Sequence, residues 1–120
     1  KRSEEGLCEG LGWIDAETIK FKFNDEVHQC TLPNIGWREV HAMQRSPLID
    51  DISTTNRFYF VHSYHMVAEI GREEIVSMST TYGYQYPCGL RDDNVYCVQF
   101  HPEKSHRFGK QLLGAFAELC

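Results

Sequence analysis

Residues 57–64 limit the possible folds more than any other segment. They read Arg-Phe-Tyr-Phe-Val-His-Ser-Tyr, and apolar side chains occupy most positions instead of every second one. This pattern is typical of a strand inside a sheet that is covered on both faces. Residues 74–82 continue in the same manner with β-branched and small side chains. Both segments therefore predict buried strands of an α/β fold.

The first half of the chain carries further strand signals. Residues 18–23 alternate between apolar and lysine side chains, which predicts a half-buried strand. Residues 26–32 can pair with it across a turn at residues 24–25. Residues 33–36, Pro-Asn-Ile-Gly, favour a loop, and a short extended piece is expected at residues 37–41.

The second half ends in a predicted hairpin and a helix. Residues 88–91 and 95–100 flank Asp-Asp-Asn at residues 92–94, which are residue types of a tight turn. Ser105 can then cap a helix whose first turn follows it. The helix places its apolar side chains on one stripe, formed by Phe108, Leu112, Leu113, Phe116 and Leu119.

That helix contains two glycines, Gly109 and Gly114, which lower its intrinsic stability. We therefore expect it to depend on packing against the strands. Repeated strand–helix alternation, the sign of a complete doubly wound domain, is missing. The chain is predicted to be a strand-rich α/β portion with one C-terminal helix.

Length and charge narrow the possible function classes. The 120 residues suggest one domain with a modest core. A formal net charge of −5 leaves no basic stripe for a nucleic-acid partner. No apolar run reaches the roughly 20 residues of a membrane helix, and the first residues lack the apolar core of a secretory signal.

The cysteines indicate a reducing compartment. Five are scattered without a Cys-x-x-Cys pair, at Cys8, Cys30, Cys88, Cys97 and Cys120. An odd number without such pairs favours reduced thiols, so we expect a cytoplasmic protein. Cys97 lies inside an apolar run and is expected to pack as a small hydrophobic residue.

A histidine, a proline and a glutamate follow the apolar run at residues 95–100. In an extended stretch, residues two apart point to the same side, so His101 and Glu103 are expected to meet. A carboxylate beside an imidazole fixes its tautomer and stabilises the imidazolium, which suits a general base. Taken alone, the tripeptide is more often only the end of a strand.

Five segments form a set that occurs in one order along the chain. They read Ser-Glu-Glu-Gly at 3–6, Gly-Leu-Gly-Trp-Ile at 10–14, Pro-Asn-Ile-Gly-Trp-Arg-Glu-Val at 33–40, Phe-Tyr-Phe-Val-His-Ser-Tyr at 58–64 and Val-Gln-Phe-His-Pro-Glu-Lys-Ser at 98–105. Together they resemble the class I (triad) glutamine amidotransferases over nearly the whole chain. Within that family they look closest to the glutaminase subunits of imidazole glycerol phosphate synthases.

The resemblance implies that residues 1–120 are a partial domain, the C-terminal portion of a flavodoxin-like α/β glutamine amidotransferase domain. In this family a cysteine thiolate attacks the side-chain amide of glutamine, forms a thioester and releases ammonia. His101 and Glu103 occupy the positions of the other two triad members. Ser63 and Tyr64 would help to hold the glutamine backbone. Neither a metal nor another cofactor is implied.

The resemblance also implies a protein partner. The glutaminase would dock on a (β/α)8-barrel cyclase of histidine biosynthesis, with Trp37 and Tyr59 toward the ammonia exit and Lys104 near the docking surface. The close alternative is an ammonia supplier to a sugar amidotransferase of surface-polysaccharide synthesis. His65 and the run Lys-Ser-His-Arg-Phe-Gly at residues 104–109 keep that alternative open.

The family's nucleophile lies in a Gly-x-Cys-x-Gly elbow between a strand and a helix, shortly before Ser-Glu-Glu-Gly. The resemblance therefore puts the elbow upstream of Lys1, and residues 1–120 alone are expected to be inactive. Residues 6–10 also read Gly-Leu-Cys-Glu-Gly, but polar residues precede Cys8 and glycines follow it. Cys97 lies four strand residues from His101, about 13 Å away, which is beyond hydrogen-bond reach.

Two readings from other classes stay open. A truncated domain could serve as a non-catalytic binding or structural module, and it would expose a sheet edge and apolar faces through which copies self-associate. A self-contained thiol hydrolase would use Cys8 as its nucleophile.

Other histidines and cations favour structural interpretations. His62 is at least as well explained as a core histidine bonded to the backbone as by a role in ligand contact. A spacing of three on a strand sends His62 and His65 to opposite faces, which argues against a metal pair. The basic cluster at the helix start is expected to be a solvated surface rather than a phosphate site; it consists of Lys104, His106, Arg107 and Lys110.

Overall fold

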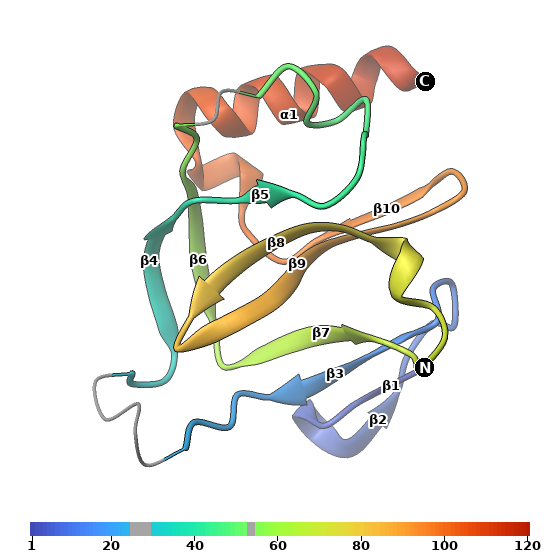
Figure 1. Cartoon of the computed structure of the whole chain (residues 1–120), viewed down its shortest axis with the longest axis vertical. Coiled ribbons are helices and arrows are strands. Elements are labelled where there is room, and N and C mark those ends of the chain that lie inside the picture. The colour runs from blue at the N-terminus through green and yellow to red at the C-terminus, as the bar shows by residue number, and fades with distance from the viewer. Residues whose placement is uncertain (25–29, 53–54) are drawn as a thin grey trace.

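A computed structural model of the chain describes residues 1–24, 30–52 and 55–120 (Figure 1). The first sheet has the strand order β2 (Cys8–Glu9), β1 (Arg2–Ser3), β3 (Ala16–Lys20) and β7 (Tyr64–Ala68). The second has the order β10 (Val95–Val98), β9 (Tyr84–Asp92), β8 (Val76–Tyr82) and β5 (His41–Ala42). The third pairs β4 (Asn34–Arg38) with β6 (Phe58–His62).

The described residues contain one α-helix, α1 (His106–Leu119), which lies along one side of the strands (Figure 1). Short 3-10 turns occur at η1 (Glu5–Leu7), η2 (Glu73–Ile75) and η3 (Pro102–Lys104). The predicted strand-rich α/β fold with a C-terminal helix is therefore confirmed. Across these same ranges, no helix has the length and apolar character needed to cross a membrane.

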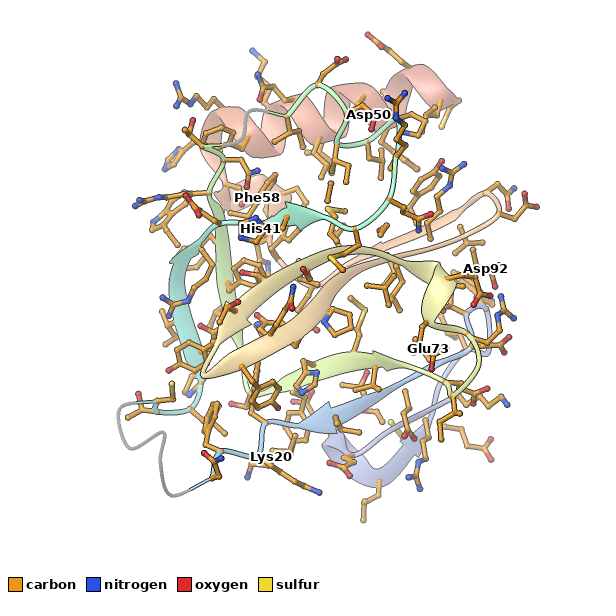
Figure 2. The ribbon with its side chains drawn as sticks, viewed as in Figure 1. Lys20, His41, Asp50, Phe58, Glu73 and Asp92 are labelled. Carbon is orange, nitrogen blue, oxygen red and sulfur yellow. The ribbon has the colours of Figure 1, made fainter. Side chains whose placement is uncertain are left out.

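β6 is the strand predicted from residues 57–64, but its side chains alternate in burial instead of being covered on both faces. Phe58 and Phe60 are fully buried, whereas Tyr59 is half-buried. The Phe58 and Phe100 ring centroids lie 4.2 Å apart, and Figure 2 shows Phe58 between α1 and the strands. Burying a phenylalanine stabilises the folded state by ~2–3 kcal/mol. One face of β6 therefore packs in the core, whereas the other face carries half-buried side chains.

The loop predicted at residues 33–36 is wrong, because most of this segment belongs to β4. β4 pairs antiparallel with β6, from Asn34 opposite His62 to Arg38 opposite Phe58. Pairing with the apolar β6 outweighs the local turn preference of Pro-Asn-Ile-Gly, since strand formation depends strongly on tertiary context. The short extended piece predicted at residues 37–41 is divided between β4 and β5.

β3 has other partners than the predicted one. The segment expected to pair with it, residues 26–32, falls mostly on residues 25–29, which lie outside the described residues. β3 pairs antiparallel with β7 along its whole length and parallel with β1 at Thr18. Phe21 follows β3 directly and is buried, so the chain after β3 still enters the core.

The hairpin predicted around residues 92–94 is confirmed. β9 and β10 pair antiparallel on either side of this turn. Asp93 has a φ of 53° there, a conformation that aspartate adopts more readily than most residues. β10 ends at Val98, before the predicted end of the strand, so the chain bends before it reaches His101.

α1 begins directly after Ser105, but the predicted cap is wrong, because the Ser105 side chain makes no capping hydrogen bond. The Ser105 hydroxyl donates to the His101 carbonyl at 2.6 Å and accepts from the Tyr59 N–H at 3.0 Å. A fully buried hydroxyl needs partners, and the bond with Tyr59 joins the helix start to β6.

The apolar stripe of α1 is only partly covered by the described residues. Phe108 and Leu112 are buried, whereas Leu113, Phe116 and Leu119 are 44–48% exposed. The self-association expected from the sequence stays a prediction, and this exposed part of the stripe is one surface where it would occur.

Gly109 lets α1 lie close against η3. A Cβ on Gly109 would lie 1.7 Å from the Pro102 carbonyl oxygen, whereas a Cβ on Gly114 would have no heavy atom within 4 Å. We predict that Gly109→Ala lowers the free energy of unfolding by ~1–3 kcal/mol, as overpacked sites do, despite the better helix propensity of alanine.

Gly114→Ala is the matched control and should raise the free energy of unfolding by up to ~1 kcal/mol. Urea unfolding followed by circular dichroism measures both variants. Equal stabilisation by the two substitutions would contradict the close approach of α1 to η3.

Candidate functional site

The predicted pair of His101 and Glu103 is in contact. His101 Nδ1 lies 2.8 Å from Glu103 Oε1. The backbone of His101 is extended, but the 3-10 turn η3 begins at Pro102. The two side chains therefore meet across a turn and not along a strand, which corrects the geometry expected from the sequence.

The backbone of His101 is fixed on both sides of its side chain. Its N–H donates to the Tyr59 carbonyl at 3.0 Å. Its carbonyl accepts from the Lys104 N–H at 3.0 Å and from the Ser105 hydroxyl at 2.6 Å. These bonds tie the turn to β6, so the direction of the imidazole is set by the sheet.

The contact with Glu103 defines the tautomer of the neutral His101 ring. A carboxylate only accepts hydrogen bonds, so Nδ1 carries the proton and Nε2 keeps its lone pair. The pKa of Glu103 is lowered, first by a hydrogen bond from its own backbone N–H and then by the His101 imidazole. The side chains of His101 and Glu103 are 37% and 60% exposed, so a reactant can approach the ring.

The three residues predicted to face a partner lie together with a fourth. We call Trp37, Tyr59, Lys104 and His106 the aromatic patch. The Trp37 ring lies 5.6 Å from the Tyr59 ring and is stacked 5.4 Å from the His106 ring. Lys104 Nζ lies 6.0 Å from the centroid of the Tyr59 ring. The sequence predicts His106 as part of a solvated basic cluster and gives no signal for its contact with Trp37.

Strand register explains why Trp37 and Tyr59 touch. They are directly opposite in β4 and β6. Tyr59 directs its N–H to Ser105 and its carbonyl to His101, so it makes no ladder hydrogen bonds with Trp37. In an antiparallel pair such residues have the closer side chains. The same strand edge therefore positions His101 and the aromatic patch.

Ser63 and Tyr64, the predicted glutamine-holding residues, lie at the bend between β6 and β7. The Ser63 carbonyl accepts from the Phe21 N–H at 3.2 Å, and the Tyr64 carbonyl lies 2.7 Å from His62 Nδ1. The structure does not bring either residue into hydrogen-bond contact with His101 or Glu103. The two parts of the predicted site are joined through β6.

The expectation that His62 and His65 face opposite sides is wrong, because the bend at Ser63 interrupts the strand. Both rings pack against Phe21, at centroid distances of 5.4 and 4.7 Å. Burial lowers the pKa of both histidines. Within residues 1–24, 30–52 and 55–120, no three His, Cys, Asp or Glu side chains are grouped to hold a metal ion.

Neither Cys8 nor Cys97, the two cysteines weighed from the sequence, is placed as an elbow nucleophile for His101, and the same holds for Cys88. Cys8 lies in β2, the next element along the chain is the strand β3 and not a helix, and β2 is at the opposite end of the molecule from α1 (Figure 1). Burial raises the pKa of Cys88, which keeps its thiol protonated. Cys97 Sγ lies 3.4 Å from Met66 Sδ, and burial raises its pKa as well.

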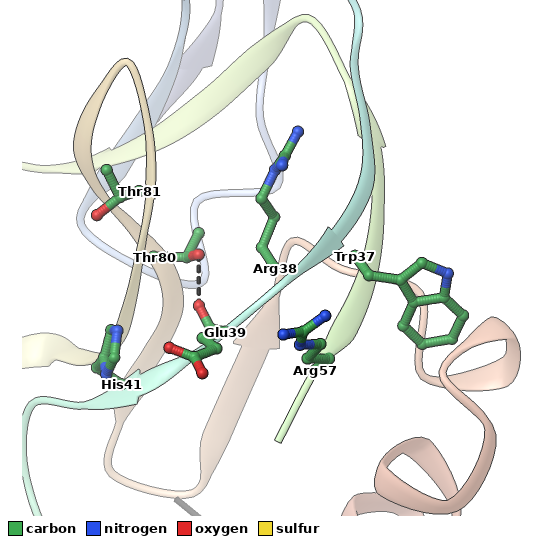
Figure 3. Close-up of a pocket in the computed structure, with 7 residues that line it drawn as sticks. All are labelled: Trp37, Arg38, Glu39, His41, Arg57, Thr80 and Thr81. Carbon is green, nitrogen blue, oxygen red and sulfur yellow. Dashed lines mark hydrogen bonds between the residues drawn. The ribbon is translucent and has the colours of Figure 1, made fainter. Parts of the chain in front are cut away.

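An open cleft of about 350 Å³ adjoins the aromatic patch at Trp37 (Figure 3). Its other lining residues are Arg38, Glu39, His41, Arg57, Thr80 and Thr81. The Thr80 hydroxyl donates to the Glu39 carbonyl at 2.6 Å. Neither His101 nor Glu103 lines the cleft. Its residues come from separate segments of the sequence, so no local motif indicated it.

Comparison with known proteins identifies a family that matches most of the chain. A profile described as glutamine amidotransferase class-I matches residues 16–118. A Pseudomonas aeruginosa protein named imidazole glycerol phosphate synthase subunit HisH 2 is 42% identical over 118 residues, 98% of this chain and 56% of that protein.

Two further relatives carry the name of the same kind of subunit. A Methanococcus maripaludis protein, also named imidazole glycerol phosphate synthase subunit HisH 2, is 41% identical over 114 residues, 95% of this chain and 54% of that protein. The Leptospira interrogans subunit HisH is 42% identical over 117 residues, 98% of this chain and 56% of that protein. The chain spans about half the length of the curated relatives it matches.

Proposed function

Because the chain belongs to the class-I glutamine amidotransferase family, we propose that residues 1–120 carry part of the active site of a glutaminase. The enzyme hydrolyses the side-chain amide of glutamine, producing glutamate and ammonia. His101 is its general base and acid, and Glu103 orients the imidazole.

The hydrogen bond between His101 Nδ1 and Glu103 Oε1 supports this proposal most directly. With the proton held at Nδ1, the Nε2 lone pair can take the proton of a cysteine thiol. The same nitrogen can then protonate the leaving ammonia. A thiol at its ordinary pKa is mostly protonated at neutral pH, so the attack requires such a base.

The proposal assigns the nucleophile to a cysteine outside residues 1–120. Cys8 lies at the far end of the molecule, and burial keeps the thiols of Cys88 and Cys97 protonated. The order of family motifs along the chain supports an elbow that precedes Ser3. Cys8 follows the 3-10 turn η1, and the next element after β2 is the strand β3. A thiol hydrolase that uses Cys8 therefore lacks the strand-to-helix turn that exposes an elbow nucleophile.

The bend at Ser63 and Tyr64 is the proposed site for the backbone of the substrate. Both residues are half-buried and follow β6 directly. Glutamine would reach from this bend toward His101, with its amide at the imidazole. The shared support of both parts by β6 favours this arrangement, since catalytic groups on a rigid element keep their separation.

The aromatic patch is the proposed docking surface for a partner that consumes the ammonia. Trp37 is 39% exposed, and large aromatic side chains of this kind often anchor interfaces. The relatives are named as subunits of imidazole glycerol phosphate synthase, which supports a (β/α)8-barrel cyclase of histidine biosynthesis as the partner. Their names favour this partner over a sugar amidotransferase.

We predict that His101→Ala lowers glutaminase kcat by about 10³-fold, because the loss of a general base typically costs 10²–10⁴-fold. Glu103→Gln should lower kcat by up to about 10⁴-fold, because the amide NH₂ can donate to Nδ1 and leave the ring proton on Nε2, which is the wrong tautomer for a base. The assay measures glutamate released by the polypeptide that contains residues 1–120, purified with its cyclase partner.

His41→Ala is the matched control for loss of a histidine, because His41 is exposed and outside the pair. It should retain wild-type turnover, and so should Cys8→Ser. Undiminished turnover in His101→Ala would contradict the proposed base. Loss of turnover in Cys8→Ser would instead identify Cys8 as the nucleophile.

For the docking surface, we predict that Lys104→Glu weakens binding of the cyclase about tenfold, because a reversed charge beside Tyr59 opposes the partner's complementary groups. Lys110→Glu, an equal change at an exposed lysine of α1 outside the aromatic patch, should change the dissociation constant less than twofold. Isothermal titration calorimetry compares the two, and equal weakening would place docking elsewhere.

A further inference from the structure

A buried polar cluster lies between β4, β6 and β9, at the end of β6 that precedes Ser63. Its members are Asn34, His62 and Tyr86. Asn34 and Tyr86 are 0% and 1% exposed, and Asn34 lies opposite His62 in the strand register. Polar groups at such depth must be hydrogen-bonded to be tolerated, and the proposed chemistry at His101 does not use them.

A donor and an acceptor can be assigned to each hydrogen bond of this cluster. His62 Nδ1 lies 2.7 Å from the Tyr64 carbonyl oxygen, which can only accept, so Nδ1 carries the proton. His62 Nε2 is then an acceptor. It receives the Tyr86 hydroxyl at 3.1 Å and the Asn34 amide NH₂ at 3.3 Å.

Arg38 fixes the orientation of the Asn34 amide. Its Nε and Nη2 donate to Asn34 Oδ1 at 3.2 and 3.1 Å, so the NH₂ group must point toward His62 and Tyr86. Asn34 Nδ2 also donates to the Tyr86 hydroxyl oxygen at 3.1 Å. The guanidinium itself lies over the Tyr82 ring, 4.7 Å from its centroid. Arg38 thus sets the orientation of the Asn34 amide, and Asn34 in turn donates to Tyr86 and His62.

The members of the cluster stay neutral at physiological pH. Burial lowers the pKa of His62, against the opposing effect of the Tyr64 carbonyl, and His65 and His101 lower it further. Burial also raises the pKa of Tyr86. The direction of the hydrogen bonds is therefore kept at neutral pH.

We propose that Asn34, His62 and Tyr86 are positioning residues that fix the carbonyl of Tyr64 and hence the bend at Ser63 for glutamine. This inference rests on the proposed function of that bend. The His62 imidazole closes the corner between β6 and β7 by bonding two residues ahead of itself. Because the ring is also bound by β4 and β9, the corner keeps one geometry before substrate arrives.

The molecule contains a matched pair of residues for comparison. His65 is also buried, and its Nε2 lies 2.8 Å from the Tyr84 hydroxyl. Its Nδ1 bonds the carbonyl of Met66, within β7, and not a residue of the bend. Tyr84→Phe and Tyr86→Phe each remove the hydroxyl that forms a hydrogen bond with one of the two histidines. Only Tyr86→Phe acts on the histidine that holds the Tyr64 carbonyl.

The experiment measures KM and kcat for glutamine in the polypeptide that contains residues 1–120, complexed with its cyclase. Tyr86→Phe should raise KM about five- to tenfold and leave kcat within twofold, because the reacting groups at His101 are untouched. Tyr84→Phe should leave both constants within twofold. An equal rise of KM in the two variants, or a fall of kcat at constant KM in Tyr86→Phe, would overturn the positioning role.

A second measurement separates failure of this inference from failure of the proposed function. Nitrogen-15 NMR of the histidine rings should show His62 protonated at Nδ1 in the wild type. In Tyr86→Phe, the His62 Nε2 and Tyr64 amide resonances should shift. A wild-type complex without glutaminase turnover would overturn the proposed function, and with it a role in glutamine positioning. An Nε2-protonated His62 would overturn the cluster whatever the turnover.

Discussion

Two hydrogen bonds on one edge of β6 support the rest of the site. The Tyr59 carbonyl accepts from the His101 N–H, and the Tyr59 N–H donates to the Ser105 hydroxyl. The unpaired edge of a strand offers regularly spaced donors and acceptors, and here the segment before α1 fills them. Because the turn η3 is attached in this way, the His101 imidazole and the start of α1 have fixed places relative to the sheet.

The side chains of β6 contact different parts of the structure. Phe58 and Phe60 point into the core and hold α1 through Phe100 and Phe108. Tyr59 belongs to the aromatic patch on the other face. His62, at the end of the strand, joins the buried cluster. The period of two in a strand thus separates stability from recognition, and the proposed base, docking surface and substrate bend share one support.

The sequence predicted those parts of the structure that depend on short-range patterns. The turn at residues 92–94, the apolar stripe of α1 and the contact of His101 with Glu103 all follow from neighbours along the chain. The errors occurred where tertiary partners decide. The partner strand β6 turned the expected loop at residues 33–36 into β4, and Ser105 bonds β6 instead of capping α1. The joint packing of His62 and His65 depends on a bend that strand periodicity does not reveal.

Glu103 holds His101 with its proton on Nδ1 and its Nε2 lone pair available. This arrangement can be measured by nitrogen-15 NMR of His101 at neutral pH, together with a carbon-13 titration of the Glu103 carboxyl. We expect Nδ1 to be protonated and the pKa of Glu103 to lie below its usual range. The pKa of Glu103 is lowered first by its own backbone N–H and then by His101. These contacts therefore stabilise the fold above the usual carboxyl range, and this contribution is lost as the pH falls through the lowered pKa. A proton on Nε2 of His101, or a Glu103 titration that does not change in His101→Ala, would contradict the account.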